Sequence, residues 1–406
     1  MNDALAINLG LILLVVSLVA MVSRRMRLPY SVGLVTAGIA LAFLPIGFDV
    51  PIPPDHIYAV LLPPLIFEAA LQIRWPPFRR ELPLILTLAF VGVALAAGMV
   101  AVGMHVLAGW GWFTAGIFGS LIAATDPVSV IAAFKELRVE PRLRLLVEAE
   151  SLLNDGTAAI GFTVLLALGN GAVMDPAAIA GLLLWKVFGG FLIGGTLAGA
   201  LLLLAGRADD HLVEITLTTI PAYGAFLIAE RLDASGVVAS LAAGMVIGNI
   251  GARGYLSRAG REHVFSFWEY AAFLANSIVF ILIGLHEAHQ AHSLFTQVTA
   301  IAIAVVLLGR IVAVYPLCAA FCRSRLAVGQ RYQHVLVWGG LRGALALGLA
   351  LALPSDFSGR EEIIVTAFAV VAFSIFVQGL TMPSLIRVLG LMQREDSGGA
   401  KQSARS

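Results

Sequence analysis

The stretch Glu148-Ala-Glu-Ser-Leu-Leu-Asn-Asp-Gly156 lies inside a long apolar segment, and Ala124-Thr-Asp-Pro127 lies inside the apolar segment before it. Asp126 and Asp155 are each about a dozen residues from the start of their segment, or roughly 18–20 Å at the helical rise of about 1.5 Å per residue. The hydrocarbon layer of a bilayer is about 30 Å thick, so both carboxylates are predicted near its middle. A charge at that depth is costly and normally functional. We therefore expect a site at which a small cation and a proton compete.

The composition is that of a membrane protein. The chain has 406 residues, of which 59% are hydrophobic and 13% charged, whereas a soluble domain carries about 25% charged residues. The net charge of +1 and the lack of a basic aromatic patch give no indication of a nucleic-acid partner. No phosphate-binding loop and no nucleophile–base pair at depth is present, so we expect neither an enzyme nor a cofactor. The sequence predicts an all-α polytopic membrane protein.

Apolar segments long enough to enter the bilayer recur along the whole chain. Thirteen transmembrane helices are predicted, at 5–23, 30–44, 57–73, 82–107, 113–134, 143–168, 177–205, 212–229, 236–250, 264–285, 296–321, 334–353 and 363–391.

The distribution of basic residues predicts the orientation of these segments. Of the 26 Lys and Arg, only Arg231 and Arg360 lie in loops that follow even-numbered segments, and only Lys186, Arg310 and Arg342 lie within segments. All the others lie in loops after odd-numbered segments or in the C-terminal end. Because cytoplasmic loops are enriched in Lys and Arg, the N-terminus is predicted outside and the C-terminus in the cytoplasm of a cell (inner) membrane protein.

Thirteen segments permit two six-helix halves related by inversion, a common transporter plan. We expect a single transmembrane domain over 1–392, with a first half at 1–170, a linking helix at 177–205 and a second half at 212–392. The tail, 393–406, is polar and rich in Ser, Gly and Arg, which predicts a disordered, cytoplasmic segment.

The fifth segment of each half carries helix-breaking residues at its middle. The first contains Thr125-Asp-Pro127, and the second contains Trp338-Gly-Gly-Leu-Arg-Gly343. Proline removes a backbone donor and glycine loosens the chain. Paired discontinuous helices are typical of transporter binding sites, because the freed carbonyls can bind a cation. An ordinary kink in each segment is the alternative.

Charged residues inside the segments are predominantly acidic. The acids at depth are Glu68, Asp126, Glu150 and Asp155, and the bases are Arg310 and Arg342. Glu148 and Lys186 lie closer to the ends of their segments and are left unassigned. In a low-dielectric environment the excess negative charge requires bound cations, protons or both. This imbalance is the strongest indication of cation handling.

Spacing divides the sixth segment into two polar stripes. Ser151 and Asp155 are four residues apart and share one helical face, whereas Glu150 and Asn154 share a face rotated by about 100°. We assign the first stripe to the transported ion, because hydroxyl and carboxylate oxygens suit Na⁺ or Li⁺. We assign the second stripe to a structural link with a buried arginine, and expect Arg342 to be that partner.

The remaining polar residues have weaker assignments. Asp155 in an apolar, partly hydrated cavity should hold either a proton or a cation. Asp126 is a second ligand candidate together with the carbonyl of Thr125, although Asp126 could instead cap loose backbone N–H groups. Glu68 could contact the ion through water or line the entry path. Arg310 is expected to balance charge rather than to gate.

At these positions the sequence resembles the cation:proton antiporter-1 family, which includes the NhaP-type antiporters and the plasma-membrane sodium/proton exchangers. The resemblance covers nearly the whole chain. Its specific motifs are Leu62-Pro-Pro-Leu-Ile-Phe-Glu68, Ala124-Thr-Asp-Pro127, Glu150-Ser-Leu-Leu-Asn-Asp155 and Gly339-Gly-Leu-Arg-Gly343.

The resemblance implies a homodimer in which each protomer has two inverted six-helix repeats and crossed discontinuous helices. It implies that Asp155 carries the ion and the proton. Further ligands would be Asp126, Ser151 and the Thr125 carbonyl, with Na⁺ at Asp126, Ser151 and Asp155 and with Glu68 near the site.

The resemblance also assigns Glu150, Asn154 and Arg342 to a structural cluster. Relatives with Asn-Asp at the positions of Asn154 and Asp155 look electroneutral, exchanging one cation for one proton. The leading hypothesis is therefore a secondary Na⁺(Li⁺)/H⁺ antiporter in a lipid bilayer. A K⁺/H⁺ antiporter with the same ligands is the alternative, and a cation channel is a weaker one.

Overall fold

The computed structural model describes residues 3–26, 30–43, 54–169, 176–205, 210–251, 254–290 and 297–392. The predicted polar tail at 393–406 lies outside the described residues. The described chain is all-α. Its helices are α1 (Asp3–Met26), α2 (Tyr30–Ala42), α3 (Pro54–Gln72), α4 (Trp75–Leu86), the π-helical η1 (Thr87–Gly92), α5 (Val93–Ala108), α6 (Trp112–Ala123), α7 (Val128–Leu137), α8 (Pro141–Gly169), α9 (Pro176–Ala205), α10 (His211–Arg231), α11 (Gly236–Ile250), α12 (Arg258–Gln290), α13 (Gln297–Ala320), α14 (Gln330–Trp338), α15 (Ala344–Leu351), α16 (Arg360–Phe373), the π-helical η3 (Ser374–Gly379) and α17 (Leu380–Val388).

Several helices have the length and apolar composition needed to cross a membrane. Within the described residues 7 helical stretches meet that requirement, and shorter apolar helices accompany them. One of the long stretches, Trp75–Ala108, is the continuous run of α4, η1 and α5. The sequence did not predict the π-helical turns η1 and η3, because each lies within an uninterrupted apolar segment.

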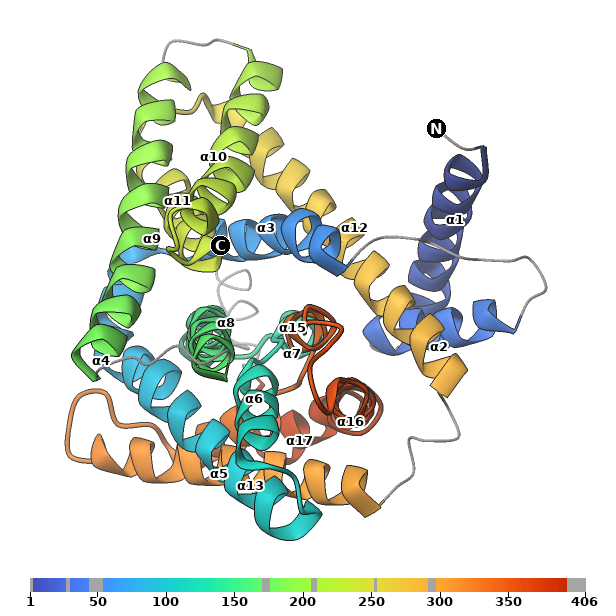
Figure 1. Cartoon of the computed structure of the whole chain (residues 1–406). Helices are drawn as coiled ribbons and strands as arrows, with labels where there is room; N and C mark the ends of the chain where they lie inside the picture. Colours follow the sequence, from blue (N-terminus) through green and yellow to red (C-terminus); the bar gives the residue numbers. More distant parts are fainter. Residues whose placement is uncertain are drawn as a thin grey trace, which may run out of the picture.

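Helix α8 runs through the middle of the molecule beside the two interrupted segments (Figure 1). In one of them α6 ends at Ala123 and α7 begins at Val128. In the other, α14 ends at Trp338 and α15 begins at Ala344. The predicted interruptions are therefore present, and both lie next to the central helix.

The outer helices form two groups around this centre. Helices α9, α10 and α11 pack on one another, and α10 and α11 also pack on α3, whereas α5 packs on α6 and α13 (Figure 1). The long helix α12 packs against α2, α3 and α10. The centre is thus held between packed helical groups, and its backbone breaks lie within the protein rather than facing lipid, where unpaired backbone groups are not tolerated.

Candidate functional site

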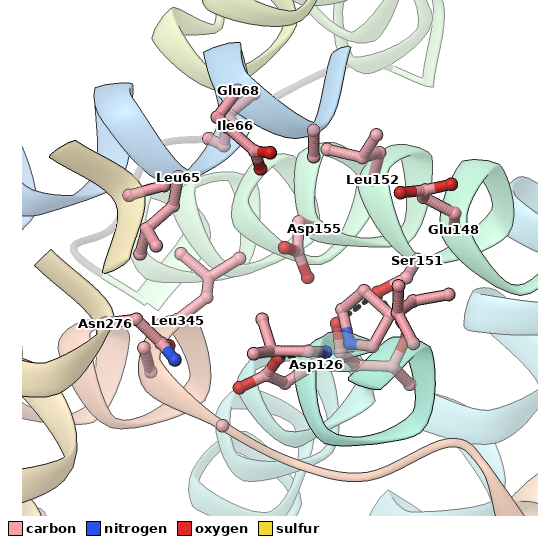
Figure 2. A pocket seen from close by; sticks show the side chains of 18 of the residues that line it. Leu65, Ile66, Glu68, Asp126, Glu148, Ser151, Leu152, Asp155, Asn276 and Leu345 are labelled. Carbon is pink, nitrogen blue, oxygen red and sulfur yellow. Dashed lines mark hydrogen bonds between the residues drawn. The ribbon is translucent and has the colours of Figure 1, made fainter. Parts of the chain in front are cut away.

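A cavity of about 330 Å³ lies between the two helix breaks and helices α3, α8 and α12 (Figure 2). Its described lining contains no Lys or Arg. The carboxylates in that lining are Glu68, Asp126, Glu148, Asp155 and Glu269. A lining that has several carboxylates and no basic side chain makes such a cavity attractive to a cation and unfavourable for an anion.

The two breaks lie against each other and are joined through their backbones. The amide of Asp126 donates a hydrogen bond to the carbonyl of Leu341 at 2.7 Å. Gly343 lies directly against Asp126, because a Cβ atom at position 343 would come within 2.3 Å of the carboxylate oxygen Oδ2. The glycine at 343 is therefore needed for the close approach of the two chains.

The stripe assigned to the ion faces the cavity. Asp155 and Ser151 both line it, and Oδ1 of Asp155 is buried without a hydrogen-bond partner among the described residues. Ser151 is 2% exposed, and its hydroxyl donates a short hydrogen bond to the carbonyl of Thr125. Asp155 consequently retains a free acceptor at the cavity, while Ser151 ties α8 to the first helix break.

Asp126 performs the capping role that was considered as an alternative to ion binding. Its Oδ1 accepts a hydrogen bond from the amide of Val128 at 2.9 Å, at the start of α7. A carboxylate there satisfies an orphan N–H and compensates the positive end of the helix. Because Asp126 also lines the cavity, capping fixes its position without removing it from the site.

The second stripe of α8 makes a buried polar cluster. Glu150 is 3% exposed, and its Oε1 lies 2.8 Å from Nη1 of Arg310. The amide of Asn154 donates to the same oxygen at 2.8 Å and to the Thr125 hydroxyl at 3.2 Å. Glu150 therefore has a fixed cationic partner, in contrast to Asp155.

The expectation that Arg342 pairs with Glu150 is wrong. Arg310, on α13, holds Glu150 and also donates to the Leu336 carbonyl at 2.7 Å, near the end of α14. Arg342 instead donates to the carbonyls of Ala123 and Ala124 at 2.8 and 3.0 Å. Each arginine thus satisfies the carbonyl end of a broken helix, where a positive charge is favoured.

Glu68 lines the cavity from α3 and belongs to a chain of polar contacts. It accepts a short hydrogen bond from the amide of Gln72, and Gln72 in turn accepts one from Arg144 at 3.2 Å. Arg144 also lies 3.6 Å from Glu148. Arg144 itself does not line the cavity, but its contacts join Gln72 on α3 to Glu148 on α8.

Several polar residues that line the cavity were not predicted from the sequence, and two of them, Glu269 and Asn276, lie on α12. Their spacing of seven residues places them on one helical face, but a lone amide in an apolar segment gives little signal by itself. Within the described residues, no group of three or more His, Cys, Asp and Glu could hold a metal ion. The donors at the cavity are oxygen atoms, which suit hard cations such as Na⁺ and Li⁺ rather than transition metals.

Comparison of the sequence with family profiles and with known proteins points to a single family. The profile of the family described as "Sodium/hydrogen exchanger, transmembrane" matches residues 10–388. The chain is 37% identical to the Na⁺/H⁺ antiporter ApNhaP of Aphanothece halophytica, over 90% of this chain and 70% of that protein. It is 36% identical to the low-affinity Na⁺/H⁺ antiporter NhaS1 of Synechocystis, over 96% of this chain and 77% of that protein.

The fold is similar to that of a solved protein. The structure of the sodium proton antiporter MjNhaP1 from Methanocaldococcus jannaschii matches with a TM-score of 0.74. The match covers 96% of this chain and 100% of that chain at 19% identity. At this identity the likeness concerns the fold.

Proposed function

The chain belongs to the sodium/hydrogen exchanger family, and from that premise we propose that it exchanges Na⁺, or Li⁺, for H⁺ by competition at Asp155. The observation that carries the proposal is the unpartnered Oδ1 of Asp155 at a cavity whose described lining has no basic residue. An ionised carboxylate in apolar surroundings requires a counter-charge. A cation or a proton neutralises the same charge on Asp155, so binding of one excludes binding of the other.

The proposed cation ligands are Asp155, Asp126, the Ser151 hydroxyl and the Thr125 carbonyl. These groups come from α8 and from the first helix break, and two hydrogen bonds already hold Ser151 against Thr125. Glu68 contributes through water or guides the ion, because it lines the same cavity. Dehydrating a cation requires several such oxygen donors in one place.

Because the cation and the proton exclude one another at one site, exchange requires that site to open alternately to the two sides of the membrane. The cavity reaches Gln72, Glu148 and Glu269, which lie near segment ends assigned to the cytoplasm by the distribution of Lys and Arg. We infer that the cavity is open toward the cytoplasm. A separate, small apolar cavity beyond Leu62 and Leu65 is lined only by hydrophobic residues and glycine, which is consistent with a seal on the opposite side.

The proposal includes the membrane arrangement expected from the sequence. Thirteen crossings form two inverted repeats, with the N-terminus outside, the C-terminus in the cytoplasm and two protomers in a homodimer. The paired breaks support the repeat, because each is the fifth segment of its half and each has an arginine at its carbonyl end.

We further propose electroneutral exchange of one cation for one proton. Asn154, next to Asp155, carries no charge, and Glu150 is paired with Arg310. Glu148 also lies on α8 at the cavity, but it is 3.6 Å from Arg144. Asp155 is then the acid of α8 that lines the cavity without an ion pair among the described residues, and we assign the change of charge to it. A single titrating carboxylate carries one proton or one monovalent cation per half-cycle.

The test is transport by purified protein in liposomes with the membrane potential clamped. Imposed Na⁺ or Li⁺ gradients should dissipate a pH gradient, and clamping the potential at different values should not change the rate. If K⁺ gradients dissipate the pH gradient better than Na⁺ or Li⁺ gradients, the protein is a K⁺/H⁺ antiporter that uses the same site. Cation flux without proton movement would indicate a channel and overturn the proposal.

A further inference from the structure

The wall of the cavity opposite the helix breaks is formed by α12. Asn276 on this helix is 6% exposed and lines the cavity. No hydrogen bond joins its carboxamide to any residue in the described part of the chain. Figure 2 shows Asn276 and Asp126 bordering the same end of the cavity, with Asp155 above them. The amide is not among the sealed, unpartnered polar atoms of the described chain, so it opens onto the cavity, where water or a bound cation can satisfy its oxygen.

Packing on both sides fixes the rotation of α12, so the amide does not face the cavity by chance. On one side Trp268 is 1% exposed, its ring lies tilted against that of Phe67 with centroids 4.5 Å apart, and its indole N–H donates to the Thr218 hydroxyl at 2.9 Å. On the other side Ser277 lies 2.9 Å from the hydroxyl of Tyr30. The adjacent residue, Asn276, is therefore held at the cavity by its neighbours.

Glu269 lies on the same face of α12 as Asn276, two helical turns earlier. Seven residues correspond to about 10.5 Å along the helix axis. Glu269 is exposed and lines the cavity, so a hydrated cation can reach it. An entering cation would therefore meet the carboxylate of Glu269 first and the neutral amide oxygen of Asn276 deeper in the cavity.

We propose that Glu269 and Asn276 form a second cation station on α12, which collects a monovalent cation and hands it to the Asp126–Asp155 site. Glu269 raises the local cation concentration through its charge. Asn276 contributes its amide oxygen as a neutral ligand while the cation loses water. This inference rests on the exchange function proposed above and adds specificity-determining residues to it.

The neutrality of Asn276 distinguishes its role from that of the carboxylates. The titratable groups facing the cavity are Glu68, Asp126, Glu148, Asp155, Glu269 and Tyr30. Asn276 adds a ligand without adding a proton site. Loss of its oxygen should weaken cation binding by the same factor at every pH.

The first experiment replaces Asn276 by the similarly sized Leu in the full-length protein. The half-saturating Na⁺ concentration for exchange should rise roughly five- to tenfold, the range expected for one lost polar contact, with an unchanged maximal rate. The shape of its pH dependence should remain that of the wild type. A half-saturating Na⁺ concentration unchanged by Asn276→Leu would contradict the proposed cation station.

A second variant and a binding measurement keep the test independent of turnover. Asn276→Asp retains size and an oxygen donor, so it should preserve or tighten Na⁺ binding while making binding more pH-dependent. The rise in melting temperature on adding NaCl, relative to choline chloride, should shrink in Asn276→Leu and persist in Asn276→Asp. A shrinkage of equal size in both variants would indicate a structural amide and contradict the proposal.

A charge-matched pair tests the outer residue. Glu262 is exposed on the same face of α12, another seven residues earlier, but does not line the cavity. Glu269→Gln should raise the half-saturating Na⁺ concentration roughly two- to fivefold at low ionic strength and less at high salt, because exposed charges are screened. Glu262→Gln should leave it unchanged, and equal effects of both changes would remove Glu269 from the station.

These outcomes separate the inference from the proposed function. Wild-type protein without Na⁺-driven proton movement would refute the exchange function itself. Wild-type exchange with unaffected Asn276 and Glu269 variants would refute the α12 station alone.

Discussion

Two polar stripes on one helix of this protein behave in opposite ways. On α8, Glu150 is held by Arg310 at 2.8 Å, whereas Asp155, five residues later, has an oxygen without a partner at a cavity. Both acids are surrounded by the same apolar core. The difference teaches that depth alone does not decide what a carboxylate can do. Under the exchange function proposed above, the acid without an ion-pair partner is the one that can accept an exchangeable charge.

The largest effect is expected from removing the unpaired carboxylate. Asp155→Asn should lower Na⁺-driven proton movement roughly 100-fold or more, since losing one member of a desolvated charge interaction costs about 3–5 kcal/mol. Folding should be preserved, because Oδ1 of Asp155 makes no hydrogen bond within the described chain. Proteoliposome exchange and thermal melting measure the two properties. Exchange that survives the substitution would end the assignment of Asp155 as carrier.

The paired carboxylate should show the reverse pattern. Glu150→Ala leaves the buried charge of Arg310 without its partner, and breaking a buried ion pair destabilises by about 3–5 kcal/mol. Melting in detergent should therefore fall sharply in this variant.

A double replacement sharpens this second prediction. Glu150→Leu combined with Arg310→Met removes both charges and should recover much of the lost stability, although the Leu336 carbonyl loses its donor. A Glu150 variant that melts like the wild type yet does not transport would make Glu150 functional and erase the contrast with Asp155.

A smaller effect is expected at the first helix break. Asp126→Asn keeps an oxygen that can accept from the amide of Val128, as Oδ1 does at 2.9 Å, so α7 should remain capped. The lost charge should raise the half-saturating Na⁺ concentration roughly tenfold, equivalent to about 1.4 kcal/mol. Concentration series in proteoliposomes measure this change. If melting temperature falls while cation affinity is unchanged, Asp126 is only a cap.

The smallest effect is expected for the hydroxyl on the ion stripe. Ser151→Ala removes a donor to the Thr125 carbonyl and a neutral ligand, so apparent Na⁺ affinity should weaken roughly three- to fivefold. Thr157, which lies outside the cavity lining and bonds its own helix at Leu153, provides a matched control as Thr157→Val. Equal effects of the two substitutions would indicate general loosening of α8.

The sequence was informative where local chemistry decides the structure. Pro127 and the glycines at 339, 340 and 343 predicted the helix breaks, and four-residue spacing predicted the two stripes. The partner of Glu150 could not be predicted this way. Choosing Arg310 over Arg342 depends on how α13 and the second break are oriented in space, and no local pattern encodes that.

Asn276 shows the same limit at the site. In the sequence it looks like any isolated polar residue in an apolar helix. Its position at the cavity depends on the contacts of Trp268 and Ser277, which fix the rotation of α12. The single acids Glu68 and Asp155 could be predicted because a charge in an apolar segment is rare. A neutral amide there is common enough to pass unnoticed.

The central claim is that a cation and a proton exclude one another at Asp155. The most direct test counts protons released when purified protein binds Na⁺, using calorimetry in buffers of different ionisation enthalpy over a range of pH. The account predicts release that approaches one proton per cation as the pH is lowered into the range where the site is protonated, and no release from Asp155→Asn. Na⁺ binding without proton release at every pH would contradict it.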